Sequence, residues 1–283
     1  SVLAPAHNKA HAIGLRSAKE VFGAEVPNVV VFDTAFHATM PPKAYMYAVP
    51  YEFYEKHAIR RYGFHGTSHK FVSRAAAEYL GKKPEELKMI TLHLGNGASL
   101  AAVDGGKVVD TSMGLTPLGG FMMGSRSGDL DPSVVGYISE LSGIKGNDLT
   151  DYLTKKAGFL GVSGISSDCR DIEVAAAEGN EKAKLVLDMY FYQLQKFVGS
   201  YTAAMNGVDA IVFTAGLGEN SASTRKEICD YLGYLGVHID SYNNSLRGKA
   251  MEISAPDSRV RVFVIPTNEE LVIARDTKEL LDK

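Results

Sequence analysis

The sequence predicts an α/β fold, and three observations carry this prediction. Apolar strand-like runs alternate with amphipathic helix-like stretches, glycine turns separate them, and no tandem repeat or low-complexity tract interrupts the pattern. The chain has 283 residues, of which 45% are hydrophobic and 22% charged, as is usual for a globular protein with a core. At about 150 residues per domain, this length corresponds to two domains.

The composition of the chain argues against some classes of binding partner. The net charge of −3 provides no global positive field for nucleic acid or an anionic membrane. No apolar run approaches the ~20 residues that cross a bilayer, and there is no secretory signal. Cys169 and Cys229 are the only cysteines, too few for a disulfide framework or a zinc knuckle. We therefore expect a cytoplasmic protein with neither nucleic acid nor a membrane as partner.

The first predicted strand is the apolar run 29–32, which ends in Asp33. A continuous apolar run of this length is typical of a buried strand that delivers a carboxylate at its C-terminal end. An irregular, aromatic region is expected to follow over residues 37–62.

A helix is predicted next, with Thr67 or Ser68 as its cap and Gly81 as its terminator. Residues 89–114 then predict three meandering strands. Their turns are an Asn-Gly pair and an Asp-Gly-Gly triplet, which tolerate the positive φ that tight turns need.

Several helices are predicted in the middle of the chain. Asp131 and Pro132 suit a cap and first turn, and Gly143 suits the end of that helix. Further helices are expected over 148–157, 169–178 and 181–205.

The helix over 181–205 is long and amphipathic. Its apolar side carries Leu187, Phe191, Leu194, Val198 and Tyr201, and Asn206-Gly207 follows its end. A homodimer interface and ordinary core packing both explain this face.

A strand, a glycine turn and a helix are predicted in DAIVFTAGLGEN, where Asn220 would cap the helix. The last strand is expected over 259–266. Thr267 and Glu270 have the spacing of a capping box, which would leave Glu269 free to point elsewhere.

Three glycine-rich turns follow apolar runs: HLGNGAS, TAGLGEN and LGGFMMGSRSGD. Glycine permits close approach of backbone amides to an anion, and a helix that begins there adds its positive end. Each turn alone is explained equally by a plain hairpin or strand–helix connection. Together they favour a nucleotide site, although the P-loop, the protein-kinase signature and GxGxxG are absent.

Arg126 lies between Gly124 and Gly128, where its guanidinium can approach a phosphoryl group. Pairing with Asp129 or Asp131 is the structural alternative.

Histidines form a second group of candidates. His65 lies among donors and glycines, where capping or packing is the alternative role. His65 and His69 are four apart, as in a zinc pair, but no third ligand lies nearby. His93 alternates with apolar residues on a strand, so a core histidine is the alternative there.

Asp33 and Glu269 each follow an apolar strand. Carboxylates placed there hold Mg²⁺ through water in many sites, because Mg²⁺ keeps part of its hydration shell. Capping of a helix or turn is the alternative for each.

Taken together, the motifs resemble those of the acetate kinase family, which includes acetate, propionate and butyrate kinases. They occur in that family's order, from Leu3 almost to the end: VFDTAFHATMP, RRYGFHGTSH, HLGNGASL, DTSMGLTPLGGFMMGSRSGDLDP, SSDCRDI, FTAGLGEN and PTNEEL. The resemblance implies an actin-like ATPase fold with ribonuclease H-like halves and a nucleotide in the cleft. Residues 34–267 would form the second domain, 1–33 a remnant of the first, and 268–283 a helix that returns to it.

The resemblance also implies residue roles. Asp33, His65 and Arg126 match catalytic residues, and Glu269 matches the glutamate associated with magnesium. Positions matching the substrate pocket are Ala6, His7, Phe64 and Pro117. Positions matching the nucleotide site are His93, Leu94, Gly95, Asn96, Gly97, Asp168, Cys169, Arg170, Gly216, Leu217, Gly218, Glu219 and Asn220.

The implied reaction is reversible in-line phosphoryl transfer from ATP to acetate, giving ADP and acetyl phosphate, with Mg²⁺ or Mn²⁺ as cofactor and a homodimer as the assembly. A carboxylate substrate is already ionised at neutral pH, since its pKa is about 4–5, and needs no general base. We therefore expect Asp33 to act through Mg²⁺ or its waters.

The chain departs from the family pattern in several places. Ala6 replaces a leucine beside the acyl pocket, so a propionate or butyrate kinase is an alternative, and Cys169 replaces an aromatic residue in the adenosine segment. The family's opening phosphate loop and a substrate arginine are absent, and the first residue is not Met. We therefore expect little or no activity from this chain alone, and a non-catalytic nucleotide-binding or dimerising fragment is the second alternative.

Overall fold

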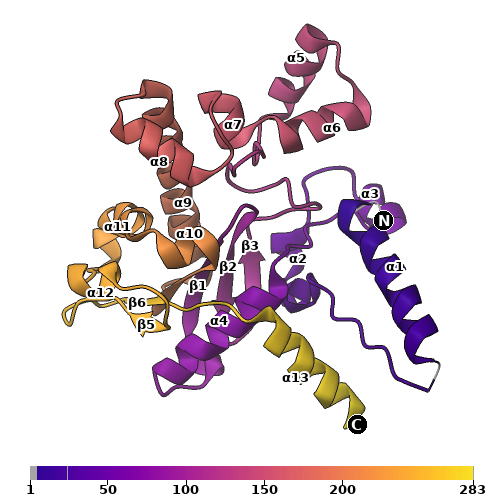
Figure 1. Cartoon of the computed structure of the whole chain (residues 1–283), viewed down its shortest axis with the longest axis horizontal. Helices are drawn as coiled ribbons and strands as arrows, with labels where there is room; N and C mark the ends of the chain where they lie inside the picture. The colour runs from indigo at the N-terminus through magenta and orange to yellow at the C-terminus, as the bar shows by residue number, and fades with distance from the viewer. Residues whose placement is uncertain (1–4, 24, 283) are drawn as a thin grey trace.

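A six-stranded sheet of order β3-β2-β1-β4-β6-β5 organises the computed structural model (Figure 1). The structure describes residues 5–23 and 25–282, with side chains from residue 9 onward. The strands are β1 Lys88–Leu94, β2 Ala98–Asp104, β3 Lys107–Thr111, β4 Ala210–Thr214, β5 Met251–Glu252 and β6 Arg261–Val264.

Strand directions confirm the predicted α/β class. β1, β2 and β3 form the expected antiparallel meander, whereas β4 pairs parallel with both β1 and β6. β5 pairs antiparallel with β6 at the edge. This order, with β2 antiparallel to its neighbours, is the ribonuclease H-like arrangement that the resemblance implied.

The register of the first hairpin decides which side chains share a face. His93 on β1 lies opposite Ser99 on β2. Because side chains alternate along a strand, Thr91 and His93 lie on one face of the sheet, and Leu92 and Leu94 lie on the other.

The helix α9, Glu181–Met205, packs against the face that carries Leu92. Asn180 caps it, which the sequence analysis did not predict, and Asn206 ends it with φ 53°, where the sequence predicted its end. Leu194, Val198 and Tyr201 are buried in the core, so this part of the apolar side serves core packing.

The helix α4, Gly66–Tyr79, packs against the opposite face of the sheet (Figure 1). The prediction of Thr67 or Ser68 as its cap was wrong, since the N-cap is His65, in the left-handed region at φ 58°. Neither hydroxyl caps the helix: Thr67 donates to Glu269, and Ser68 bonds to His93. The termination near Gly81 was correct.

The predicted central helices are confirmed. Asp131 accepts a hydrogen bond from the Ser133 N–H (2.8 Å), and Gly143 ends the helix with φ 73°. α7 was not predicted. The helices here are α5 Pro132–Ser142, α6 Gly146–Lys155, α7 Gly158–Ser163 and α8 Cys169–Ala177.

Two predicted caps were wrong in the C-terminal part. TAGLGEN contains a short helix of its own, α10 (Ala215–Asn220), so Ser221 rather than Asn220 caps α11 (Ala222–Asp230). Asn268, not Thr267, caps α13 (Glu269–Leu281), because its side chain accepts from the Leu271 N–H.

The predicted strand over 29–32 was also wrong. This segment is irregular, and Phe32 is 67% exposed. A strand needs a neighbour for its backbone hydrogen bonds, and the described sheet pairs this segment with neither of its edges. The remaining helices are α1 Pro5–Phe22, η1 Ala35–Thr39, α2 Pro42–Tyr45, α3 Glu52–His57, η2 Pro84–Glu86, η3 Gly233–Leu235 and α12 Ser241–Ser245.

Figure 1 shows α1 away from the sheet. It also shows α13 beginning at the N-terminal end of α4, where Thr67 donates to Glu269, and leading away from the sheet. Over the described ranges, no helix combines the length and the apolar composition needed to cross a membrane.

Candidate functional site

Two carboxylates each accept a hydrogen bond at the N-terminal end of α4. The Asp33 carboxylate accepts a hydrogen bond from the His65 N–H (2.7 Å), and its carbonyl accepts from the Gly66 N–H (2.9 Å). Glu269 comes from the other end of the chain and accepts a hydrogen bond from the Thr67 hydroxyl. The positive end of the helix dipole stabilises negative charge there, which explains why both acids are tolerated together.

His65 and Arg126 converge on Gly97. A Cβ added at Gly97 would lie 3.2 Å from Nη1 of Arg126 and 3.5 Å from Nε2 of His65. The guanidinium donates to the Pro117 carbonyl (3.1 Å). Burial lowers its pKa, but an arginine guanidinium remains charged at neutral pH because its ordinary pKa lies far above 7. The structure therefore brings one cation and one imidazole to the same glycine turn.

Backbone contacts hold the Arg126 loop in place. The Arg126 carbonyl accepts from the Met123 N–H (3.0 Å), and Ser127 donates to the Leu153 carbonyl (3.1 Å). Gly158 lies at φ 60°, where a Cβ would be only 2.9 Å from the Arg126 nitrogen. Only glycine fits this close approach, so the start of α7 supports the loop.

The two acids considered as partners of Arg126 are used elsewhere. Asp129 accepts from the Gly120 N–H (2.9 Å), and Asp131 caps α5.

The imidazole of His65 stacks on that of His93, with ring centroids 4.0 Å apart and planes 15° apart. Burial lowers the pKa of His93 to about 4. Burial, followed by the charges of His93 and Arg126, lowers the pKa of His65 well below its ordinary value. Both rings are therefore neutral at physiological pH and can donate one hydrogen bond each without carrying charge.

Hydroxyl groups hold the inner nitrogens of this pair. Nδ1 of His65 lies 2.8 Å from Oγ of Ser99, and Nδ1 of His93 lies 2.8 Å from Oγ of Ser68. The Nε2 atoms face the glycine turn instead: Nε2 of His93 is 3.5 Å from a Cβ added at Gly95.

Beside this turn lies a hollow of about 830 Å³. Its lining comes from three segments that the family resemblance assigned to a nucleotide site, around residues 93–97, 168–170 and 216–220. The predicted residues that line it are Gly95, Asn96, Asp168, Cys169, Arg170, Gly216, Leu217 and Asn220. The lining residues that were not predicted individually are Ala98, Met123, Gly124, Phe159, Ser167, Glu173, Tyr190, Ser221, Ala222, Ser223 and Arg247. Of these, Ala98, Met123, Gly124 and Ser167 lie within motifs that the sequence indicated.

Other predicted nucleotide residues contribute differently. Leu94 is buried in the core, and Gly218 packs against the backbone of Phe213. Glu219 accepts hydrogen bonds from the backbone N–H groups of Ala215 (2.8 Å) and Thr267 (3.3 Å). These residues shape the backbone of the hollow rather than line it.

The candidates for the acyl pocket are partly described. Phe64 is buried next to His65, and Pro117 contacts Arg126 through its carbonyl. The side chains of Ala6 and His7 lie outside the described residues.

The arginines of RRYGFHGTSH are structural in this arrangement. Arg60 lies over the Tyr45 ring at 3.7 Å, and Arg61 donates to the carbonyls of Thr111 and Ser112 (2.8 and 2.9 Å). Both arginines therefore serve the local structure, and His65 is the side chain of this segment that lies beside Gly97 together with Arg126.

Sequence reasoning also missed Arg225, which is fully buried. It donates to the carbonyls of Gly218 (2.9 Å) and Glu219 (3.0 Å) and to the side chain and carbonyl of Asn244. Burial lowers its pKa to about 10. A lone arginine in a helix gives no sequence signal for such a role, which depends on where α10 ends.

Within the ranges that the structure describes, no group of three or more His, Cys, Asp or Glu side chains could hold a metal ion. His69 forms hydrogen bonds with both of its ring nitrogens, to Thr91 and Ser99.

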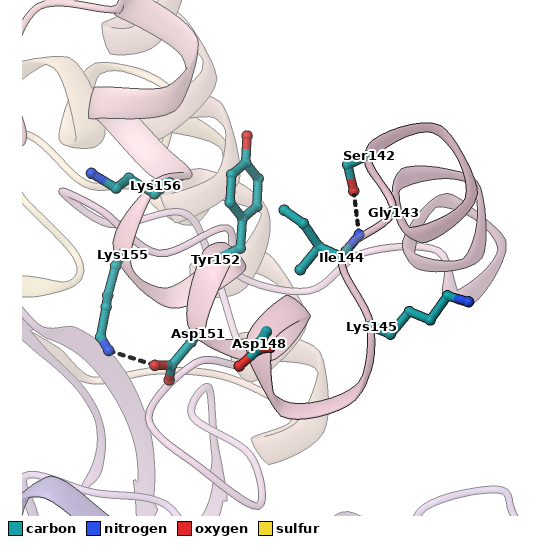
Figure 2. Close-up of a pocket in the computed structure, with 9 residues that line it drawn as sticks. All are labelled: Ser142, Gly143, Ile144, Lys145, Asp148, Asp151, Tyr152, Lys155 and Lys156. Carbon is teal, nitrogen blue, oxygen red and sulfur yellow. Dashed lines mark hydrogen bonds and ion pairs between the residues drawn. The ribbon is translucent and has the colours of Figure 1, made fainter.

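Figure 2 shows another hollow, between α5 and α6, with Lys155 paired to Asp151 (2.6 Å). Lys145, Tyr152 and Lys156 also line it, and it contains none of the predicted site residues. It shares no lining residue with the site formed by His65, His93 and Arg126.

Comparison with known proteins gives a consistent result. The model of the acetokinase family matches residues 1–275. Acetate kinase of Thermotoga petrophila is 62% identical over 286 residues, covering 100% of this chain and 71% of that protein. Acetate kinase of Methanosarcina thermophila is 55% identical over 280 residues, covering 99% of this chain and 68% of that protein.

Solved structures agree. Acetate kinase of Porphyromonas gingivalis superposes with a TM-score of 0.94 at 49% identity, covering 99% of this chain and 70% of that one. A propionate kinase of Francisella tularensis gives 0.90 at 47% identity, covering 97% and 70%. The chain belongs to the acetokinase family, and the family predicted from its motifs is confirmed.

Proposed function

We propose that this chain binds ATP or ADP in the 830 Å³ hollow and serves reversible phosphoryl transfer between ATP and acetate, giving ADP and acetyl phosphate. One observation carries the proposal: His65 and Arg126 meet at Gly97, in the same glycine turn whose Gly95 and Asn96 line the hollow. A phosphate tail that extends from the hollow along this turn would reach both side chains.

The proposed chemistry relies on positioning and charge. In phosphoryl transfer the protein performs little covalent chemistry, and donors aimed at the equatorial oxygens stabilise the transition state. Arg126 would supply a positive, forked donor, and His65 a neutral one. A neutral donor suits a site that also holds a guanidinium, because a second cation would be repelled.

The carboxylates Asp33 and Glu269 would hold Mg²⁺ or Mn²⁺, through water for at least part of the shell. Their chemistry fits a hard cation, which prefers oxygen ligands, and both lie at the start of α4. When bound, the metal neutralises charge on the β- and γ-phosphates. Because acetate is already ionised, Asp33 is assigned to the metal and not to proton abstraction.

Three further assignments belong to this proposal. Residues 34–267 would form the nucleotide-binding domain, with 1–33 and 268–283 belonging to another. A homodimer is supported by the exposed Leu185 and Tyr192 on α9, and size-exclusion chromatography with light scattering tests it. A cytoplasmic location is supported by two cysteines that are buried and unpaired.

The test of the reaction runs in the direction of ATP formation, from ADP and acetyl phosphate, since luciferase then detects slow turnover. We expect slow ATP formation that requires acetyl phosphate and Mg²⁺ and falls to background in Arg126→Ala. Saturable ADP binding without any transfer would instead support a nucleotide-binding protein without catalytic activity.

A propionate substrate is the second candidate, supported by the neighbour named a propionate kinase. The ratio of kcat/KM for acetyl and propionyl phosphate distinguishes the two. A ratio above 1 supports acetate, and a ratio below 1 supports propionate.

A further inference from the structure

A continuous row of hydrogen bonds runs inward from His65. Nδ1 of His65 lies 2.8 Å from Oγ of Ser99, which lies 2.8 Å from Nε2 of His69. Nδ1 of His69 lies 2.7 Å from Oγ1 of Thr91. Ser99, His69 and Thr91 are fully buried, so no water replaces a missing partner along this row.

The Thr91 hydroxyl, at the inner end of the row, determines which group donates in each hydrogen bond. Among the described residues, the Thr91 hydroxyl has one acceptor, Nδ1 of His69. A buried hydroxyl hydrogen without an acceptor is unfavourable, so Thr91 donates to that nitrogen. A neutral imidazole has one bare and one protonated nitrogen, so His69 carries its hydrogen on Nε2.

The same reasoning extends to the outer end. Nε2–H of His69 donates to Oγ of Ser99. The Ser99 hydroxyl then donates to Nδ1 of His65, its other neighbour among the described residues. His65 is thereby left with a bare Nδ1 and a protonated Nε2. In the opposite direction, every bond could also form, but the Thr91 hydroxyl would then have no acceptor.

We propose that Thr91, His69 and Ser99 are positioning residues that hold His65 as its Nε2–H tautomer, so that this hydrogen faces Gly97 and Arg126 and can be donated to a phosphoryl oxygen. The role of that hydrogen in transfer rests on the proposed function, whereas the tautomer itself does not.

A second hydroxyl acts in the same way on the stacked ring. Ser68 is fully buried, and Nδ1 of His93 is the acceptor available to its hydroxyl among the described residues. His93 therefore also presents a protonated Nε2, on the side of Gly95. His37 is also protonated on Nε2, because this nitrogen lies 2.8 Å from the Phe64 carbonyl and must donate to it, although no hydroxyl bonds to its Nδ1 among the described residues. His65 and His93, whose Nε2 atoms face the glycine turn, would thus each offer one hydrogen-bond donor to a ligand there.

Nitrogen NMR of the histidine-labelled, 283-residue chain tests the proposal, because long-range ¹H–¹⁵N spectra distinguish a bare ring nitrogen from a protonated one. His65→Gln and His69→Gln assign the signals by their loss. In the wild type we expect a bare Nδ1 and a protonated Nε2 in both His65 and His69. Protonation of His65 on Nδ1 would overturn the proposal.

Three variants test whether Thr91 and Ser99 determine the tautomers of His69 and His65. Thr91→Val should move the nitrogen shifts of both His69 and His65 toward averaged values, and Thr91→Ser should restore them. Ser99→Ala should average His65 only, because Thr91 still sets His69. Ser73→Ala is the matched control: Ser73 is also buried on α4, but it bonds to the Lys70 carbonyl, so no histidine signal should change.

If Thr91→Val leaves His65 unchanged while His69 averages, the proposed transmission is wrong. If Thr91→Val does not fold, Ser99→Ala decides the outcome in the same way, since an unchanged His65 overturns the proposal. Acetyl-phosphate-dependent ATP formation is measured separately on the wild type. Its absence, with the expected tautomers present, would reject the proposed function and not the tautomer.

Discussion

His65 and His93 stack face to face at 4.0 Å although they lie 28 positions apart, one at the cap of α4 and one near the end of β1. Two imidazoles this close cannot both be charged without strong repulsion. Burial lowers the pKa of both. The stack is thus a pair of neutral donors beside a guanidinium.

Gly97→Ala is expected to reduce phosphoryl transfer by up to roughly 10-fold, because its Cβ would shift the guanidinium by a few tenths of an ångström, and a full misplacement of about 1 Å costs about 100-fold. The new Cβ would lie 3.2 Å from Nη1 of Arg126, so the guanidinium must shift. The luciferase assay measures the effect. Gly136→Ala on α5 is the control, since no atom lies within 4 Å of its new Cβ. Equal rates in both variants would contradict the placement of Arg126.

Asp33→Asn is expected to raise the Mg²⁺ concentration needed for half-maximal activity by about 10-fold, the lower end of the effect of losing a supporting ligand contact. The amide oxygen can still accept from the His65 N–H, so the start of α4 should stay intact. Mg²⁺ titrations of rate, with the exposed Asp257→Asn as control, provide the measurement. A lower rate with a solvent proton inventory and unchanged Mg²⁺ dependence would instead favour proton abstraction by Asp33.

Stability should rise with pH between about 5 and 6.5. Burial lowers the pKa of His37 and His93 to about 4, below the ordinary value of 6.5 that they regain on unfolding. Between these values the unfolded state binds more protons, so acid destabilises the fold by up to about 1.4 kcal/mol per pH unit for each histidine. Urea midpoints at pH 5, 5.75, 6.5 and 7.5 measure this slope.

His37→Gln should make the unfolding free energy less dependent on pH, because the contribution of His37 to the slope is lost. Its amide can still donate to the Phe64 carbonyl, which Nε2 of His37 contacts at 2.8 Å. A wild-type midpoint that is flat from pH 6.5 to 5 would show that these rings protonate without unfolding.

Arg225→Lys is expected to destabilise the chain by about 3 kcal/mol and weaken ADP binding. Lysine cannot satisfy the carbonyls of Gly218, Glu219 and Asn244 together, and an unsatisfied buried acceptor costs about 1–3 kcal/mol. Calorimetric titration with ADP and urea unfolding measure both effects. Arg259→Lys is the control, since Arg259 is exposed and bonds to the Leu235 carbonyl. If ADP affinity is unchanged in Arg225→Lys, the end of α10 does not shape the hollow.

Local patterns determined much of this protein from the sequence alone. The hairpin turns predicted the meander of β1, β2 and β3, and Asp131 with Pro132 predicted the start of α5, because these signals act over a few neighbouring residues. The long motifs identified the family and three of the segments that line the 830 Å³ hollow. Two local predictions were wrong. The apolar run 29–32 forms no strand, because no edge of the described sheet pairs with it, and Thr67 does not cap α4, because its hydroxyl donates to Glu269.

Only the tertiary structure decided how the site is assembled. It brought His65 and Arg126 to one glycine, buried Arg225 under α10, and connected His65 to Thr91 through Ser99 and His69. None of these contacts has a local signal, because each depends on the register of β1 against β2 and on how α4 lies across them. Tautomers and lowered pKa values follow from burial and from partners distant in the chain, which only the packed fold creates.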